Sequence, residues 1–507
     1  MDRIENARFL PDWLARSAGS FPQRLAVQDG QTRWSFADLD RAASRTARQL
    51  ATLGVQAGDR VALLAGNSCT YVAVVHALTR LGAILVPLNA RLTPGELCWQ
   101  LRDVRATLLV HDARCAAPAT AIGRELSDLR RAALAETAGN NTTAIGALPG
   151  ADVALRSLID LDAIQAIMYT SGTTGQPKGA IITYGMQWWN AVGSVLNLGH
   201  APDDRWLACL PLFHIGGLSI LMRSAIYGIG VIVHERFDAA TVNRSLREDG
   251  VTMISVVAVM LKRMLDALDA EQPGSGYPPA LRCVLLGGGP APYPLLEECA
   301  RRAIPVVQTY GLTESCSQAV TLAPGDALRK PGSAGRPLMP VQLRVLRDGQ
   351  PAPAGEPGEI YLRGPTITPG YADRPEETAR AFRDGWLATG DIGYLDGEGY
   401  LYVLDRRADL IISGGENVYP AEVESVLLSH PDVAEAGVCG QPDAQWGQVP
   451  IAYVHLRDGS TLSTSADELL AYAGQRLARY KLPRAIYFVG PLPRNASGKL
   501  VRRALRE

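Results

Sequence analysis

The feature that most restricts the fold is a repeated alternation of short aliphatic runs with longer segments of helical spacing. From Leu25 to about Ala240 the aliphatic runs include RVALLAG, GAILVPL, TLLVHD and GVIVHERF, and the alternation continues to PVVQTYG, which ends at Gly311. Strands that alternate with helices favour parallel pairing, because each crossover helix returns the chain to the same edge of the sheet. We therefore predict an α/β fold with largely parallel sheets in this part of the chain.

The pattern changes after this region. Residues 332–404 have dense turns and short strands such as GEIYLRG and GYLYVLD, which predicts an antiparallel, β-rich subdomain. The remaining residues alternate helix and strand patterns and suffice for a small α+β domain. We expect two domains, residues 1–404 and residues 405–507, with a core helix and strand over 71–88 and a surface loop over 139–152.

Composition narrows the class of protein. The chain has 507 residues, of which 47% are hydrophobic and 20% are charged, and its formal net charge is -1. This balance provides no basic excess of the kind that drives binding to nucleic acid or anionic membranes. Eight cysteines are scattered without a CxxC pair, which predicts reduced, buried thiols, including Cys316. We expect a cytoplasmic protein without a signal peptide or a membrane span, and the sequence leaves a homo-oligomer open.

A polar, glycine-rich segment, Tyr169 to Gly179 (YTSGTTGQPKG), follows one of the predicted strands. Glycines let backbone N–H groups approach phosphate oxygens closely, hydroxyls donate to them, and a lysine adds positive charge. The segment is not a Walker A loop, since Gly-Lys-Ser/Thr is absent and Pro177 intervenes. A polar surface loop is the alternative, although a chance match to so long an ordered pattern is rare. The residues expected to contact phosphate are Thr170, Ser171, Gly172, Thr173, Thr174 and Lys178.

This segment resembles the phosphate-binding signature of the adenylate-forming superfamily, which includes acyl-CoA synthetases, firefly luciferase and the adenylation domains of peptide synthetases. Further signatures follow in the family's order, and one motif alone would be weak evidence. They are PLFH at 211–214, GGGPA at 287–291, YGLTE at 310–314, TGD at 389–391, DR at 405–406, SGGEN at 413–417 and PRNASGK at 493–499. The resemblance implies an N-terminal domain that binds ATP and a carboxylic acid, and a mobile C-terminal domain that carries a catalytic lysine.

The matching residues have chemistry that suits a bound nucleotide. A carboxylate at Glu314 can hold Mg²⁺ against phosphate oxygens, and Thr313 can donate to the α-phosphate as a catalytic residue. Asp391 suits the ribose hydroxyls, although an aspartate that caps a turn is the alternative. Arg406 is expected to make a second ribose or phosphate contact. The adenine is expected to lie between Tyr310 with Gly311 and a wall of small residues, namely Gly288, Gly289, Pro290 and Ala291.

The expected catalytic cation is Lys499, which would bridge the attacking carboxylate and the α-phosphate. A C-terminal lysine is usually a solvated surface residue, so this assignment depends on the motif around it. In the family, the small domain then rotates and CoA attacks the acyl-adenylate. Gly414 and Gly415 would line the thiol channel in that second step. Ala408 departs from the Asp or Lys that many relatives carry at the hinge.

The segments from about Ile164 to Arg503 are similar to those of o-succinylbenzoate-CoA ligases of the menaquinone pathway, and the similarity includes YGMQWWNAVGSVLNLG and HIGGLSILMRSAIYG. That substrate has a second carboxylate, which needs a cation, and Arg223 lies on an otherwise apolar predicted helix. An arginine that reaches water or pairs with an internal acid is the alternative. His214, Gly289, Ser317 and Gln318 are further candidates for contacting the acid. His214 is also expected to be a catalytic residue, which closes over the acyl chain or polarises the keto oxygen.

Three other functions remain open at this stage. The first is another aryl- or acyl-CoA ligase, which activity with a monocarboxylic acid would reveal. The second is a stand-alone adenylation domain that loads a carrier protein, which CoA dependence would exclude. The third is a regulatory nucleotide-binding protein, which acid-dependent pyrophosphate exchange would exclude.

Overall fold

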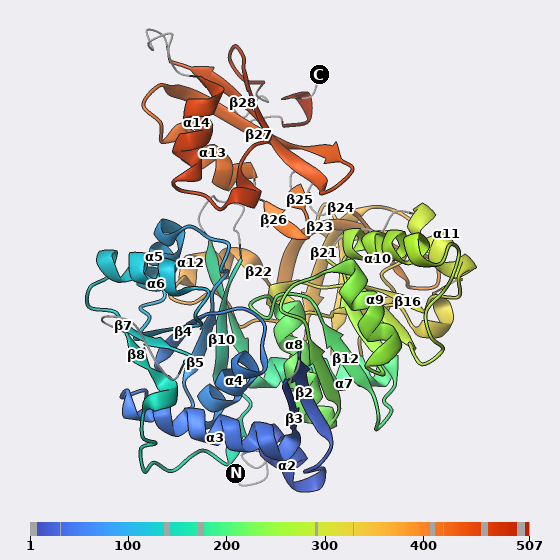
Figure 1. The fold of residues 1–507 in the computed structure, drawn as a ribbon. Coiled ribbons are helices and arrows are strands. Elements are labelled where there is room, and N and C mark those ends of the chain that lie inside the picture. Colours follow the sequence, from blue (N-terminus) through green and yellow to red (C-terminus); the bar gives the residue numbers. More distant parts are fainter. Residues whose placement is uncertain are drawn as a thin grey trace. The chain divides into compact units, whose positions relative to one another are not determined.

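The structure is a computed structural model that describes residues 8–30, 32–135, 142–170, 177–288, 293–327, 329–405, 411–418, 420–457, 465–493 and 502–505. The chain forms two compact units, which are described separately (Figure 1). Unit 1 comprises Met1–Ala90, Asp103–Met168 and Gly179–Asp405, and unit 2 comprises Arg91–Arg102, Tyr169–Lys178 and Arg406–Glu507. The division into functional domains at residues 1–404 and 405–507 stays a prediction.

Two sheets with parallel pairing follow the predicted strand–helix alternation. Sheet I has the order β11-β10-β5-β4-β6-β7-β8, and its pairs from β10 to β8 are parallel. Its strands are β4 (Arg60–Leu64), β5 (Ile84–Pro87), β6 (Leu108–His111), β7 (Arg130–Ala133), β8 (Thr143–Ala144), β10 (Ile164–Thr170) and β11 (Lys178–Thr183).

Sheet II has the order β18-β17-β16-β15-β14-β12-β13-β2-β3 and is parallel from β16 to β2. Antiparallel strands complete both of its edges. Its strands are β2 (Leu25–Asp29), β3 (Thr32–Ser35), β12 (Arg205–Ala208), β13 (Gly230–Val233), β14 (Met253–Val256), β15 (Cys283–Leu286), β16 (Val306–Tyr310), β17 (Val320–Thr321) and β18 (Arg336–Pro337).

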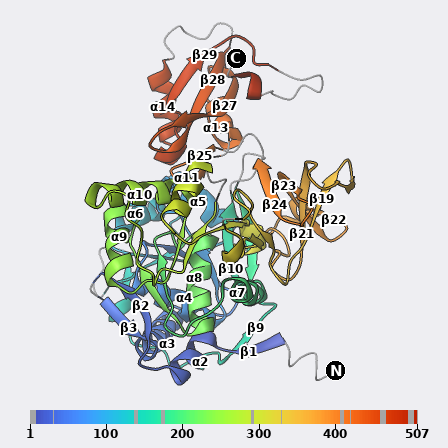
Figure 2. The ribbon, with the colours of Figure 1, turned by 90° about the vertical axis from the view of Figure 1, so that its right-hand side faces the viewer.

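Both faces of sheet II are buried, which explains why its strands are continuous apolar runs in the sequence. Side chains alternate between two cores: Trp206 and Ala208 enter one core, whereas Leu207 and Cys209 enter the other. The first core is shared with sheet I and with helices that include α4 (Cys69–Leu81) and α8 (Ile215–Tyr227), which lie centrally in unit 1 (Figures 1 and 2). One apolar core therefore fixes both sheets together.

The remaining helices of unit 1 differ in which core they cover. Helices α9 (Ala239–Glu248), α10 (Ala258–Glu271) and α11 (Tyr293–Arg301) lie on the second face of sheet II. Around the first core and sheet I the helices are α2 (Trp13–Ser20), α3 (Phe36–Thr52), α6 (Ala116–Glu125) and α7 (Tyr184–Leu198). Short β1 (Phe9–Pro11) and β9 (Leu158–Asp160) form an antiparallel pair.

The predicted β-rich subdomain is confirmed as sheet III, with the order β20-β19-β21-β23-β22 and with β24 paired to β23, all antiparallel. One short helix, α12 (Pro375–Ala381), interrupts it. Its strands are β19 (Gln342–Arg347), β20 (Gln350–Pro351), β21 (Gly358–Arg363), β22 (Phe382–Arg383), β23 (Trp386–Leu395) and β24 (Leu401–Asp405).

Unit 2 contains the predicted helix–strand–strand–helix–strand series. Its sheet has the order β26-β25-β28-β27, with β29 parallel to β28. The elements are α5 (Pro94–Asp103), β25 (Ile411–Ser413), β26 (Glu416–Val418), α13 (Pro420–Leu428), β27 (Val433–Asp443), β28 (Gly447–Leu456), α14 (Ala466–Gly474) and β29 (Ala485–Phe488). Single 3-10 turns are η1 (Ile145–Ala147), η2 (Thr313–Ser315), η3 (Pro324–Asp326), η4 (Arg479–Lys481) and η5 (Arg502–Leu505).

Two local expectations have different outcomes. The core helix and strand predicted over 71–88 are confirmed as α4 and β5. The loop predicted over 139–152 is wrong in part, because β8 and η1 occupy residues 143–147 and Ile145 is buried in the first core. In the described parts of the chain, no helix has the length and apolar character that a membrane crossing requires.

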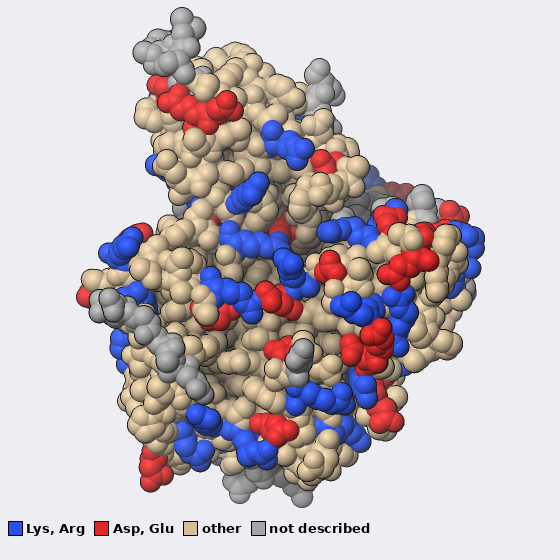
Figure 3. Space-filling model, viewed as in Figure 1, with Lys and Arg blue, Asp and Glu red and all other residues tan. Residues whose placement is uncertain are grey.

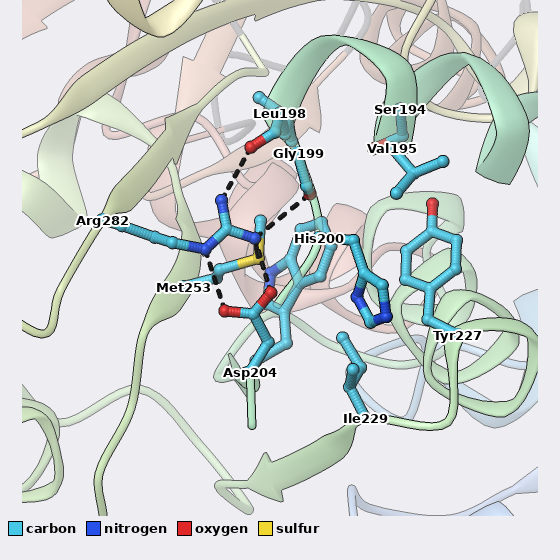
Figure 4. A pocket seen from close by; sticks show the side chains of 11 residues that line it. Ser194, Val195, Leu198, Gly199, His200, Asp204, Tyr227, Ile229, Met253 and Arg282 are labelled. Carbon is cyan, nitrogen blue, oxygen red and sulfur yellow. Dashed lines mark hydrogen bonds and ion pairs between the residues drawn. The ribbon is translucent and has the colours of Figure 1, made fainter. Parts of the chain in front are cut away.

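Arg282, the residue before β15, connects Asp204, the residue before β12, to the carboxyl end of α7 (Figure 4). Its Nε and Nη2 donate to the two carboxylate oxygens of Asp204 at 2.8 and 2.6 Å. Its Nη1 donates to the carbonyl of Leu198 at 2.7 Å, and Nη2 donates to that of Gly199 at 3.2 Å, so the guanidinium also binds the carboxyl end of α7. Asp204 and Arg282 line a small pocket together with His200, and the charge of each is compensated by the other.

We predict that Arg282→Ala lowers the free energy of unfolding by about 3 kcal/mol, because it leaves the carboxylate of Asp204 buried without its cation. Urea denaturation measures this value. The surface variant Arg301→Ala, which removes an exposed pair with Glu298, should change it by less than about 0.5 kcal/mol. Equal effects of the two variants would contradict the assignment.

The same variant should alter the acid dependence of stability. Burial acts to raise the pKa of Asp204, but Arg282, the Ala201 N–H and Thr252 together lower it below its ordinary value. A lowered carboxylate pKa stabilises the fold above about pH 4, and this contribution is lost as the pH falls through the lowered value. The stability difference between the unmodified protein and Arg282→Ala should therefore shrink below about pH 4.

Candidate active site

The candidate site lies where the parallel strands of sheet II end. Strands β12, β15 and β16 end at Ala208, Leu286 and Tyr310, and each is followed by one of the polar or glycine-rich segments found in the sequence. The carboxyl ends of parallel strands share one edge of a sheet, which is where α/β proteins bind ligands. The fold therefore brings residues of the 211–214, 287–288 and 310–318 segments to the same edge.

The segment after β16 has a backbone that is held in an unusual conformation. Cys316 and Ser317 have positive φ angles of 57° and 84°, which side chains rarely adopt. A Cβ on Gly311 would lie 1.5 Å from the carbonyl oxygen of Ser317, so only glycine fits there. The amide of Ala319 donates to the carbonyl of Tyr310 and closes the segment. Strain of this kind concentrates at binding sites.

Glu314 lies in η2, between β16 and the strained residues. Its Oε1 accepts a hydrogen bond from the hydroxyl of Tyr371 at 2.9 Å, and its carbonyl accepts from the amide of Thr368 at 2.7 Å. Protein Mg²⁺ sites commonly use one or two carboxylates together with substrate phosphates, so a single oriented carboxylate fits this ion. Tyr371 was not predicted from the sequence. The role of Glu314 as the metal ligand, with Thr313 beside it, stays a prediction.

Two predicted nucleotide residues meet in the structure. The hydroxyl of Tyr310 donates to Oδ2 of Asp391 at 2.7 Å, although the two residues are far apart in the chain. Asp391 is 5% exposed and lies within β23. Its backbone N–H donates to the hydroxyl of Thr389 at 3.1 Å. The pair joins the end of sheet II to sheet III.

Arg223 lies on α8, as predicted, and its side chain is among the largest that are fully buried, with 1% exposure. This excludes the alternative in which the guanidinium reaches water. Its carbon Cζ lies 5.3 Å from the centre of the Trp206 ring, and burial lowers its pKa from the ordinary value. Within the described residues its Nε has no hydrogen-bond partner. A buried guanidinium with an unused donor suits an anionic ligand.

Asn190 on α7 connects Arg223 to the segment after β16. Its Oδ1 accepts a hydrogen bond from Nη2 of Arg223 at 2.5 Å, and its Nδ2 donates to the carbonyl of Gln318 at 2.7 Å. The structure thus brings the predicted residues Arg223 and Gln318 together through a residue that we had not predicted. The available signal was a polar residue within the apolar helix QWWNAV.

His214 and Gln318 complete the described candidates for acid binding in unit 1. His214 precedes α8 as its N-cap residue and its ring lies 4.4 Å from that of Phe213, centre to centre. Gln318 is buried, its Oε1 accepts from the Thr321 hydroxyl at 3.3 Å, and its Nε2 has no partner among the described residues. The contacts of these residues with an acid stay predictions, as does that of Ser317.

The glycine loop of unit 2 has a clear local structure. Gly414 and Gly415 connect β25 to β26 as the two loop residues of a hairpin, and both have positive φ angles, 58° and 84°. Such a turn requires glycine or asparagine at both positions. A Cβ on Gly414 would also lie 2.6 Å from the Trp446 ring. These constraints explain both glycines without a ligand, so their contact with a thiol stays a prediction.

The phosphate segment is described only at its ends. Strand β10 ends at Thr170 and β11 begins at Lys178, and the hydroxyl of Thr170 donates to the carbonyl of Lys178 at 3.4 Å. Gly288 is exposed with a φ of 81°. The other predicted residues that lie outside the described part of the chain are Ser171, Gly172, Thr173, Thr174, Gly289, Pro290, Ala291, Arg406 and Lys499.

The charged surface has no dominant sign on the face drawn in Figure 3, where basic and acidic side chains of the described residues are interspersed. All eight cysteines are free and buried, as predicted, Cys316 among them. Burial raises the pKa of its thiol to about 12, so this residue is a neutral wall of the site.

Comparison with known proteins gives consistent matches along the chain. The family model described as AMP-binding enzyme matches residues 14–372, and the model described as AMP-binding enzyme C-terminal domain matches residues 422–499. The chain is 53% identical over 497 residues to 2-succinylbenzoate–CoA ligase of Geobacillus kaustophilus, covering 98% of this chain and 97% of that protein.

Solved structures of o-succinylbenzoate CoA synthetase (MenE) from Bacillus subtilis are also similar, each with 44% identity and 98% coverage of this chain. A double mutant bound with its product analogue OSB-NCoA has a TM-score of 0.90 with 98% of its chain covered. The complex with the acyl-adenylate intermediate OSB-AMP has a TM-score of 0.75 with 98% covered. The complex with ATP and magnesium ion has a TM-score of 0.74 with 100% covered.

We predict that Tyr310→Phe destabilises unit 1 by about 2 kcal/mol, because the buried carboxylate of Asp391 loses a hydrogen-bond donor. It should also weaken ATP binding, if both residues contact the nucleotide. Urea denaturation and calorimetric titration with ATP measure the two effects. Tyr394→Phe, on a ring that stacks against Tyr402, is the matched control and should leave ATP affinity unchanged. Unchanged ATP affinity in Tyr310→Phe would contradict the nucleotide role.

Proposed function

The chain belongs to the AMP-binding enzyme family, and from this premise we propose that it is an AMP-forming acid–thiol ligase. It converts o-succinylbenzoate, ATP and CoA to o-succinylbenzoyl-CoA, AMP and pyrophosphate through an acyl-adenylate, with Mg²⁺ as the metal ion. Full-length similarity to 2-succinylbenzoate–CoA ligases supports this activity. The observation that carries the choice of acid is Arg223, a buried cation that has a neutral amide as its partner.

In the first step, an oxygen of the substrate carboxylate bonds to the α-phosphorus of ATP while the bond to the bridging oxygen breaks and pyrophosphate leaves. Negative charge shifts onto the α-phosphate oxygens and the leaving group. Lys499 and Thr313 would stabilise that charge, and Glu314 would hold Mg²⁺ in an orientation set by Tyr371. Asp391, itself oriented by Tyr310, would fix the ribose.

In the second step, the sulfur of CoA, as a thiolate, attacks the acyl carbon of the adenylate and AMP leaves with the electron pair of the C–O bond. The thiol proton passes to solvent. Gly414 and Gly415 would border the path of the thiol, because neither residue carries a side chain that could obstruct it. Rotation of the small domain at a hinge near Ala408 would switch the enzyme from the first step to the second. Ala408 stands where many family members carry Asp or Lys.

We expect the site that binds the acid to distinguish diacids from monoacids by the charge of the second carboxylate. A substrate carboxylate close to Arg223 offsets the cost of burying the guanidinium, whereas a monoacid leaves that cost in place. Gln318 and Ser317 add hydrogen-bonding groups at the neighbouring segment, and His214 lies at the start of the same helix. Arg223 therefore favours a diacid over other aryl or acyl substrates.

We also propose that the protein acts in the cytoplasm, without a nucleic-acid partner. Eight free, buried thiols and an overall charge of -1 support this proposal. Cell fractionation with an antibody against the chain tests the location, and recovery in a membrane fraction would overturn it.

The activity is tested by CoA consumption and pyrophosphate release with purified protein, ATP and Mg²⁺. We expect turnover with o-succinylbenzoate, and activity confined to benzoate or fatty acids would exclude the acid. Carrier-protein loading without CoA consumption would support the alternative adenylation domain.

Lys499→Ala separates the two steps in the same assay. It should abolish pyrophosphate release yet still convert supplied acyl-adenylate and CoA. Lys330→Ala, which removes a cation bonded to Asp396 and Glu398, serves as the control and should keep both steps. Loss of both steps in Lys499→Ala would contradict the division of labour.

We predict that Arg223→Ala raises the KM for o-succinylbenzoate by about 100-fold, because the buried ion pair between the guanidinium and the second substrate carboxylate is lost. The KM for ATP should change by less than about threefold. Steady-state kinetics with each substrate varied in turn provides both values. The control Arg263→Ala removes another helical arginine that lies over an aromatic ring, Phe237, and should leave both constants unchanged. An unchanged KM for the acid in Arg223→Ala would remove the assigned role.

A further inference from the structure

Asn190 on α7 holds the side chain of Arg223, which lies on α8. It is 1% exposed, and its two amide atoms bond outward to two other segments of unit 1. The oxygen accepts from the guanidinium of Arg223, and the nitrogen donates to the backbone of Gln318. A single buried amide thus fixes the guanidinium on α8 relative to the strained segment after β16. Its position depends on α7, whose carboxyl end is bound by Arg282.

The partner that Asn190 offers is neutral, which leaves the charge of Arg223 uncompensated. No carboxylate among the described residues pairs with this guanidinium. The titratable groups that act on it are Tyr227 and Cys316, and burial raises the pKa of each to about 12, so both are neutral near pH 7. The Trp206 ring contributes only a cation–π contact. The site therefore keeps a full positive charge in a buried setting.

Two side-chain donors also bear on how this site would bind an acid. Nε of Arg223 and Nε2 of Gln318 are buried and have no hydrogen-bond partner among the described residues. Buried donors without partners are costly, and a bound ligand that supplies an acceptor removes that cost. Asn190 binds the guanidinium of Arg223 directly and binds the backbone carbonyl of Gln318. An acceptor held by both donors would need oxygen atoms with lone pairs to spare, as a carboxylate has.

We propose that Asn190 is a positioning residue that sets the preference for an acid with a second carboxylate, because it orients Arg223 without neutralising it. This inference rests on the proposed function. An aspartate at this position would keep the shape and the acceptor oxygen, and would lose the donor to the Gln318 carbonyl. Its carboxylate would form an internal ion pair with Arg223. The charge that attracts the substrate carboxylate would then be satisfied within the protein.

The test is Asn190→Asp, assayed with o-succinylbenzoate and with two monoacids. These are 4-oxo-4-phenylbutanoate, which keeps only the aliphatic carboxylate of o-succinylbenzoate, and 2-butanoylbenzoate, which keeps only the aromatic carboxylate. Pyrophosphate release at saturating ATP gives kcat and KM for each acid. We expect kcat/KM for the diacid to fall ~10-fold or more, mainly through KM. For the monoacid that reacts, kcat/KM should stay within about threefold of the unmodified protein.

Two further variants separate charge from packing. Asn197→Asp alters a residue of the same helix whose amide donates to the Leu322 carbonyl at 3.2 Å, and it should keep the preference for the diacid. Asn190→Ser is a poorer match in shape but stays neutral, so it should retain more of that preference than Asn190→Asp. Thermal unfolding verifies that each variant is folded.

The outcomes distinguish the two levels of the claim. If the unmodified protein fails to turn over the diacid, the proposed function falls and the inference falls with it. If it turns over the diacid and Asn190→Asp lowers kcat/KM equally for diacid and monoacid, only the inference is overturned. The same follows if Asn190→Ser loses the preference as completely as Asn190→Asp, because shape rather than charge would then decide it.

Discussion

The burial of the Arg223 guanidinium without a carboxylate partner is the constraint on which the proposed acid site depends. Transfer of an arginine from water costs several kcal/mol unless other groups compensate. Here the compensation is incomplete: one amide oxygen, one indole ring and the surrounding dipoles hold Arg223, and an Nε donor remains unused among the described residues. These contacts hold the Arg223 side chain in a fixed position. Two buried sheets supply the stability that such a residue requires.

That stability comes from a packing arrangement with little freedom. Strands of sheet II alternate side chains into two cores, and the first core also includes sheet I, α4 and α8. Helix α7 is bound at its carboxyl end by Arg282, which is in turn held by Asp204. A displacement of α7 would move Asn190, and with it the guanidinium. Contacts therefore run from Arg282, next to β15, through α7 to Arg223 in the proposed acid site.

The sequence allowed prediction of the parts that depend on local pattern. The parallel sheets follow from apolar runs that are buried on both faces, and the helix that carries Arg223 follows from its spacing. Contacts between distant segments were beyond such reasoning. Tyr310 with Asp391, Glu314 with Tyr371 and Arg223 with Asn190 each join elements that no periodicity relates. The loop expected over 139–152 failed for the same reason, since a strand edge and a buried isoleucine give residues 143–147 their structure.

The buried cysteines give the molecule an intrinsic reporter of its own opening. A thiol reacts as its thiolate, and burial keeps the sulfur away from reagents in the folded structure. For Cys316, burial also raises the pKa of the thiol to about 12. Six of these residues belong to unit 1, whereas Cys98 and Cys439 belong to unit 2. The rate at which each thiol is alkylated therefore measures how often its own surroundings open, without any engineered label. Cys316, beside Arg223, makes the proposed acid site itself visible in this way, and a ligand bound there would slow its alkylation.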